Sequence, residues 1–153
     1  MDRGQADIVV ADLGRELGIP ALALNDDGMG ILVLDESATV VAIGYNQVAG
    51  TLDLMTCLAE VESSPARSLA ALRANFGSRG PGGETLAVDP TSGAFVLQRR
   101  YGGQDLVESG LAGAVRGLLA HAEQWTRQFA SLAGPRSGAS GNAARASGGG
   151  IRA

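Results

Sequence analysis

Lysine is absent from the chain, cysteine and histidine occur once each, and aromatic residues make up 4% of the 153 positions. The single cysteine, Cys57, cannot form an internal disulfide, which fits a reducing compartment. No run approaches the roughly 18 consecutive apolar residues of a membrane helix. The N-terminal stretch MDRGQADIVV lacks the basic segment and long apolar run of a secretory signal. These absences predict a cytosolic protein without a membrane span.

Charge is unevenly distributed. Residues 1–133 hold nine of the 12 basic residues and all 16 acidic ones, so their formal charge is −7. Contacts to phosphate groups need clustered arginine or lysine, so this acidic body argues against nucleic acid as a partner. Residues 134–153 contain three arginines among glycine, alanine and serine, with almost nothing to bury. We therefore expect one domain at 1–133, followed by a disordered tail at 134–153.

No motif typical of catalysis or metal binding is present. His121 lies beside an apolar helical stripe, where a structural or surface role is expected, and Cys57 is expected to be a buried small apolar residue. A Cys–His pair between them has no local support, and one residue of each kind does not make a zinc site. The glycine-rich loop 77–83 lacks the Lys-Ser/Thr ending of a phosphate-binding loop, and the turn 25–28 lacks the last glutamate of a calcium loop. We expect no enzyme, no metal and no cofactor.

Capping signals and apolar periodicity predict three helices. Asp2 and Gln5 have capping-box spacing, Ser64 precedes a proline at the first helical position, and Asp105 and Glu108 repeat the capping-box spacing. Apolar residues at steps of three and four from Val107 to Leu132 predict a long amphipathic last helix of roughly 40 Å. The predicted helices run from Asp2 to Leu17, from Pro65 to an end at Gly77, and from Asp105 to Leu132.

Short apolar runs bounded by turn residues predict five strands, at Ile31–Leu34, Thr39–Tyr45, Thr51–Leu58, Glu84–Val88 and Ala94–Arg99. The third alternates, with Leu52, Leu54 and Leu58 on one side and Asp53 on the other. The element order is α-βββ-α-ββ-α, which indicates an α+β fold with a twisted antiparallel sheet. Both faces of the first hairpin are apolar, so its second face needs a cover from outside the chain unless the last helix crosses over to supply it. The strand register stays open, because a shift by one residue exchanges the faces.

The second predicted helix carries two stripes. One consists of large apolar residues and the other of alanines at steps of four: Leu69, Leu72 and Phe76, and Ala66, Ala70 and Ala74. Two contact surfaces on a short helix indicate a subunit interface. The alternative is an alanine-rich helix that reflects a GC-rich genome.

Three segments carry a resemblance to a known family: ADLGRELGIPALALNDDG, GETLAVDPTSGAFVLQRR and AEQWTRQF. In this order they resemble class I type III secretion chaperones, the CesT (Tir-chaperone) family, over residues 6–132. The resemblance implies a homodimer in the bacterial cytoplasm that needs no ATP. It also implies binding of the N-terminal segment of secreted effector proteins, which stays extended, and delivery to the secretion ATPase or another apparatus component.

The resemblance also implies two groups of site residues. The dimer interface would involve Leu69, Leu72, Phe76, Leu86 and Val88. The cargo groove would involve Leu13, Leu17, Leu22, Leu24, Ile31 and Val33. With the opposite strand parity, Leu32 and Leu34 take the places of Ile31 and Val33.

Three other readings compete with this one. A roadblock-like or YbjN-like dimeric module would present a folded surface to folded partners, and binding of an unstructured effector terminus would separate it from a chaperone. A small-molecule sensor is disfavoured by the scarcity of aromatic and convergent polar residues. An enzyme is the least favoured, since no nucleophile–base or acid–base pair can be named.

Overall fold

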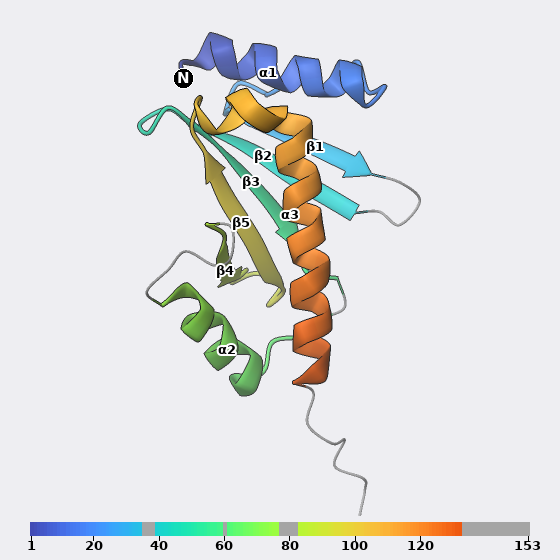
Figure 1. Cartoon of the computed structure of the whole chain (residues 1–153), viewed down its shortest axis with the longest axis vertical. Helices are drawn as coiled ribbons and strands as arrows, with labels where there is room; N and C mark the ends of the chain where they lie inside the picture. The colour runs from blue at the N-terminus through green and yellow to red at the C-terminus, as the bar shows by residue number, and fades with distance from the viewer. Residues whose placement is uncertain (35–38, 60, 77–82, 133–153) are drawn as a thin grey trace, which may run out of the picture.

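The computed structural model describes residues 1–34, 39–59, 61–76 and 83–132, with the side chains of residues 108 and 109 left out. The elements follow in the order α1 (Arg3–Glu16), β1 (Met29–Leu34), β2 (Thr39–Asn46), β3 (Thr51–Cys57), α2 (Pro65–Asn75), β4 (Thr85–Val88), β5 (Phe95–Tyr101) and α3 (Asp105–Ser131) (Figure 1). This order confirms the predicted α+β fold. The tail predicted to be disordered and most of the glycine-rich loop lie outside the described residues.

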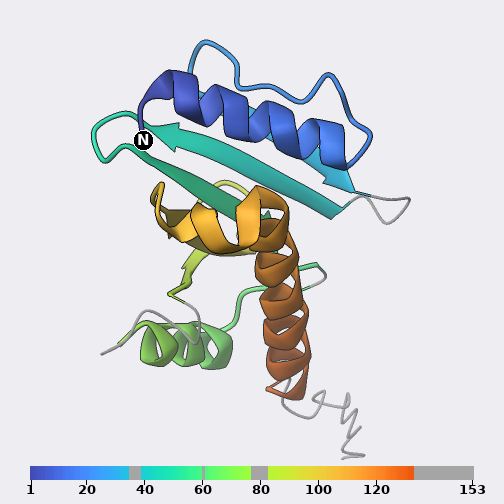
Figure 2. The ribbon, with the colours of Figure 1, turned by 45° about the horizontal axis from the view of Figure 1, so that its top comes forward.

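The five strands form one antiparallel sheet in the order β1-β2-β3-β5-β4. The first three strands are a meander, and β5 then pairs with β3, so β1 and β4 are the two edges. Helix α1 lies at the β1 end of the sheet and α2 lies beside β4 at the other end (Figures 1 and 2). The part of the chain described here contains no helix that is long and apolar enough to cross a membrane.

The predicted capping box at the start of α1 is present. The Asp2 carboxylate accepts a hydrogen bond from the backbone N–H of Gln5, whose side-chain oxygen accepts one from the N–H of Asp2. These two bonds satisfy donors that a helix start leaves free. After the helix, Gly18 has φ 71°, the left-handed conformation expected beyond a helix end.

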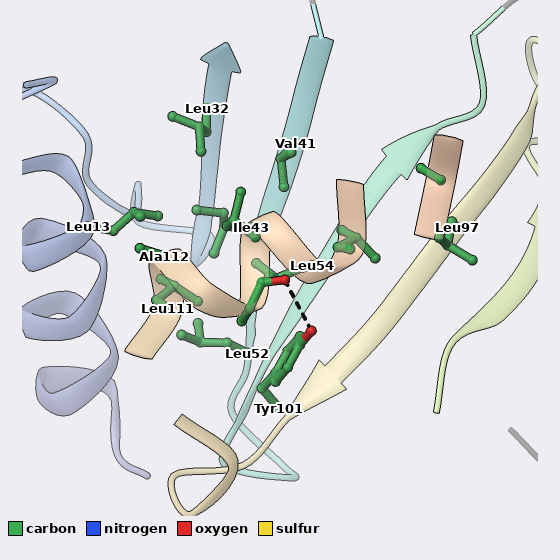
Figure 3. Packing of buried hydrophobic residues seen from close by; sticks show 14 of the residues in the cluster. Leu13, Leu32, Val41, Ile43, Leu52, Leu54, Leu97, Tyr101, Leu111 and Ala112 are labelled. Carbon is green, nitrogen blue, oxygen red and sulfur yellow. Dashed lines mark hydrogen bonds between the residues drawn. The ribbon is translucent and has the colours of Figure 1, made fainter. Parts of the chain in front are cut away.

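Apolar side chains from α1 and α3 converge on one face of the sheet (Figure 3). Leu13 of α1 and Leu111 of α3 meet Leu32, Ile43 and Leu52 from the first three strands. Farther along α3, the rings of Phe129 and Phe95 lie 4.7 Å apart. Leu52 and Leu54 of β3, and Leu58 just after it, are all buried in this core. This face of the sheet is therefore sealed by the chain's own helices.

Helix α3 is interrupted, contrary to the long helix predicted from its periodicity. Gly110 has φ 64° and ψ 175°, which is not helical, and the interruption follows a short first segment. Val107, which precedes it, is 80% exposed, whereas Leu111 and Leu118 after it are buried. The predicted capping box at Asp105 is not formed. The N-cap of α3 is Gln104, which makes no side-chain cap bond, and the Asp105 carboxylate accepts a hydrogen bond from the N–H of Gly102 instead.

Helix α2 begins as predicted, with Ser64 as its N-cap and Pro65 at the first helical position. Ala71 is buried and Ala74 is half-buried, so a strip of small residues faces the rest of the domain. Arg67 ties the helix to α3 by donating a hydrogen bond to the carbonyl of Phe129 at 3.0 Å. The large apolar residues of α2 are thereby left on its outer side.

Candidate functional site

The second face of the sheet is open where β1 and β2 meet. Met29, Ile31 and Val33 of β1 are 38%, 65% and 55% exposed, and Val40 of β2 is 43% exposed. The pairing register places Val33 opposite Val40 and Ile31 opposite Ala42, so these side chains lie on the same face. Apolar side chains gathered on one exposed face indicate a contact surface.

The register also extends this face across the sheet. Continuing from Val40, the outermost row passes through Cys57, Val96 and Ala87, all of them small or apolar. At the other end of the strands the face becomes polar, because Asp53 accepts two hydrogen bonds from Arg100, at 2.7 and 3.0 Å. The open apolar surface is thus bounded by an ion pair on one side and by the edge of β1 on the other.

The backbone of β1 offers hydrogen-bonding groups at this edge. The N–H of Tyr45 donates to the carbonyl of Gly28 at 2.8 Å, which makes this pair hydrogen-bonded. Because such pairs alternate along an antiparallel ladder, Gly30 and Leu32 turn their backbone groups toward β2. Ile31 and Val33 turn theirs to the outside. These two residues therefore present both an apolar side chain and outward backbone groups that no described part of the chain pairs with.

The predicted cargo residues divide into two groups. Leu13, Leu22 and Leu24 are at most 9% exposed and belong to the chain's own core, and Leu17 is half-buried. Ile31 and Val33 lie on the open face, whereas Leu32 is 1% exposed and points into the core, which settles the strand parity left open by the sequence. The structure thus brings Ile31 and Val33 together at the exposed edge of the sheet. Leu13, Leu22 and Leu24 lie in the core instead.

The predicted dimer residues lie mostly on the outside of α2. Leu69, Leu72 and Phe76 are 48%, 66% and 87% exposed. Val88 at the end of β4 is 41% exposed, whereas Leu86 is buried under the helix. Four of the five residues are therefore exposed, three of them on α2, and the fifth is buried beneath this helix.

Sequence reasoning missed a buried charged cluster. The Glu84 side chain is 1% exposed, and its Oε1 lies 2.7 Å from Nδ1 of His121 and 3.4 Å from Nη1 of Arg99. Its second oxygen, Oε2, is buried and has no hydrogen-bond partner among the residues that the structure describes. Beside it, the guanidinium of Arg99 sits over the ring of Tyr101 at 4.8 Å. Desolvation by burial raises the pKa of the Tyr101 hydroxyl, against the opposing effect of Arg99. The cluster ties β5, α3 and the start of β4 together.

Cys57 differs from its prediction, because its side chain is exposed. It pairs with Val96 on the open face, while its neighbour Leu58 takes the core position. His121 is partly exposed and lies against Glu84, which agrees with the expected structural or surface position. Within the described ranges, no group of three or more His, Cys, Asp and Glu side chains is arranged to hold a metal ion.

Solved structures with the same fold include complexes with named partners. A chain in the ExsC–ExsE complex aligns with a TM-score of 0.69 at 22% identity, covering 84% of this chain and 97% of that one. The HopA1–SchA chaperone–effector complex gives 0.60 at 15% identity, with coverage of 81% and 91%. The ExoT–SpcS complex from Pseudomonas aeruginosa gives 0.54 at 23% identity, with coverage of 81% and 98%. These likenesses establish the fold.

None of the curated proteins matches the chain in sequence. The model of the Tir chaperone protein (CesT) family, by contrast, matches residues 9–126, which run from the second half of α1 through every strand and α2 to most of α3. A match of this length agrees with the resemblance in the three sequence segments. The chain belongs to the Tir chaperone protein (CesT) family.

Proposed function

We propose that this protein is a type III secretion chaperone that binds the N-terminal segment of one or more effector proteins and keeps it extended and competent for secretion. The observation that carries the proposal is the edge of β1, where Ile31 and Val33 combine exposed apolar side chains with outward backbone groups. The structural relatives support it, since one of them is a chaperone–effector complex by name.

The edge suits an extended polypeptide. A strand added to β1 would receive main-chain hydrogen bonds from Ile31 and Val33, while its alternate side chains would meet the apolar surface. Natural proteins usually protect such edges with charges, prolines or bulges. An edge that carries two exposed β-branched residues is therefore better explained by a partner than by the needs of the isolated fold.

Co-expression tests the proposal. The chain is produced with the N-terminal segments of secreted proteins encoded beside it, and complexes are isolated and sized. We expect one segment to co-purify with the wild-type chain, and the double variant Ile31→Asp, Val33→Asp to lose it. Val48→Asp is the matched control, because Val48 is fully exposed in the turn between β2 and β3, away from this edge. Retention of the segment by the folded double variant would refute the assigned edge.

The exposed surface of α2 supports a second part of the proposal, a homodimer. Burying Leu69, Leu72 and Phe76 against the same surface of a second copy would remove three large apolar side chains from water. We expect light scattering to give twice the chain mass for the wild type and the monomer mass for Leu72→Asp. A dimeric Leu72→Asp variant would place the subunit contact elsewhere.

The proposed setting is the bacterial cytoplasm, where the dimer would hand its cargo to the secretion ATPase or another apparatus component. The support for this step is the family membership. The bound segment would leave the chaperone by unpairing from β1, without nucleotide hydrolysis by this chain.

A further inference from the structure

Both free edges of the sheet are closed at one position by an asparagine. At β1, the side-chain oxygen of Asn25 accepts a hydrogen bond from the N–H of Met29 at 2.9 Å. The backbone N–H of Asn25 donates to the carbonyl of Met29 at 2.8 Å. By the alternation along β1, these are the two outward backbone groups of Met29. Asn25 therefore occupies the place that a partner strand would take beside Met29.

At β4 the same arrangement is made by Asn75, the last residue of α2. Its side-chain nitrogen donates to the carbonyl of Leu86 at 2.8 Å, and its side-chain oxygen accepts from the N–H of Leu86 at 3.0 Å. The backbone N–H of Asp89 donates to the carbonyl of Ala94, so these two residues are a hydrogen-bonded pair of the β4–β5 ladder. Because hydrogen-bonded pairs alternate along the ladder, Ala87 turns its backbone groups toward β5 and Leu86 turns its groups outward. A strand cannot pair with β4 opposite Leu86 while this side chain is in place.

We call the position beside Met29 that Asn25 occupies the Asn25 stop, and neighbouring groups hold it in place. Nη2 of Arg3 donates to the carbonyl of Asn25 at 2.8 Å, and the N–H of Gly28 donates to the same oxygen at 2.9 Å. Nε of Arg3 is paired with the Asp7 carboxylate at 3.0 Å, one turn along α1. The stop is thus built from α1, the turn and β1 together.

We propose that Asn25 is a positioning residue that ends the partner strand at Ile31 and so fixes its register, while Asn75 directs strand addition away from β4. This inference rests on the proposed function. Two partner residues, two positions apart, pair with Ile31 and Val33, and their side chains extend the apolar face. A slip by one residue turns those side chains to the other face of the sheet. The recognised segment is therefore a short strand with apolar residues at alternate positions.

Hydrogen exchange at single amides, followed by NMR, tests this inference with the co-purifying effector segment as the probe. In the free wild-type chain we expect slow exchange at Met29 and Leu86 and fast exchange at Ile31 and Val33. Adding the segment slows Ile31 and Val33 at least tenfold and leaves Met29 unchanged. In Asn25→Ala, Met29 exchanges fast in the free chain, because its N–H has lost the side-chain acceptor. It becomes slow in the complex, because a carbonyl of the partner strand can now accept from this N–H.

Asn25→Asp is the conservative control, since it keeps the oxygen acceptor and should retain the wild-type pattern. Unchanged slow exchange at Val41, a core position of β2, shows that each variant is folded. Equal exchange of Met29 in wild type and Asn25→Ala would overturn the stop. A bound segment that leaves Ile31 and Val33 fast would overturn the register but leave the chaperone role standing. If no segment binds the wild-type chain, both proposals fail.

Discussion

Removing His121 should reveal how strongly the buried Glu84 carboxylate depends on its nearest partner. In His121→Ala, the guanidinium of Arg99, 3.4 Å away, is the remaining partner of Glu84 Oε1 among the described residues. The substitution provides no new hydrogen-bond partner for Oε2. Leaving a buried charge without its partner costs roughly 3–5 kcal/mol. The His121 side chain is 31% exposed, so water can replace part of the contact and we expect a loss of about 3 kcal/mol, the low end of that range.

A double-mutant cycle in urea at fixed protein concentration measures this effect, with the fluorescence of the single, buried Trp125 as the signal. In a Glu84→Gln background the charge is gone, and His121→Ala should cost about 1 kcal/mol, the usual worth of one neutral hydrogen bond. The same loss of unfolding free energy in both backgrounds would refute the assignment of a charge-dependent contact.

Two further perturbations test the packing and the electrostatics. Gly14→Ala should lower the unfolding free energy by roughly 1–3 kcal/mol, because its methyl group would lie 2.6 Å from the carbonyl oxygen of Ile19. Gly117→Ala is the control: the space around Gly117 is open, so this variant should not lower the urea midpoint. Burial raises the pKa of the Tyr101 hydroxyl above its ordinary value of 10.0. The stability that the neutral hydroxyl contributes is therefore fully present below pH 10 and is lost as the pH rises through the raised pKa. Tyr101→Phe should lose less of its unfolding free energy over that range, and identical pH profiles for the two proteins would contradict this.

Local signals in the sequence predicted the helix starts and the strands well. The capping box at Asp2 and the proline at Pro65 determine nearby backbone geometry directly, so both are found where predicted. The interruption at Gly110 could not be read, because the apolar period continues across it and glycine is tolerated within a helix. The Glu84 cluster joins residues from distant segments, and no spacing rule connects them.

The candidate site was predictable in part. The doubly apolar hairpin indicates a surface that needs a partner. When both faces of a strand are apolar, the sequence does not show which face points to the core, so the strand register and the burial were needed to place Ile31 outside and Leu32 inside. The family resemblance implies that leucines of α1 and of the segment after it line the groove, and it does not distinguish among them. Burial places Leu13, Leu22 and Leu24 in the core, a distinction that apolar character alone does not make.

The central claim, that a partner strand pairs with the backbone of β1, is tested most directly by comparing the effector-segment Kd of Val33→Pro with that of Val33→Ala. Both variants remove the β-branched side chain of valine. Proline also removes the outward N–H, and an edge strand tolerates this substitution because the hydrogen bonds to β2 come from other residues. We predict that the proline variant binds about two- to tenfold more weakly than the alanine variant, since one hydrogen bond contributes about 0.5–1.5 kcal/mol. Equal Kd values for two folded variants would contradict the account.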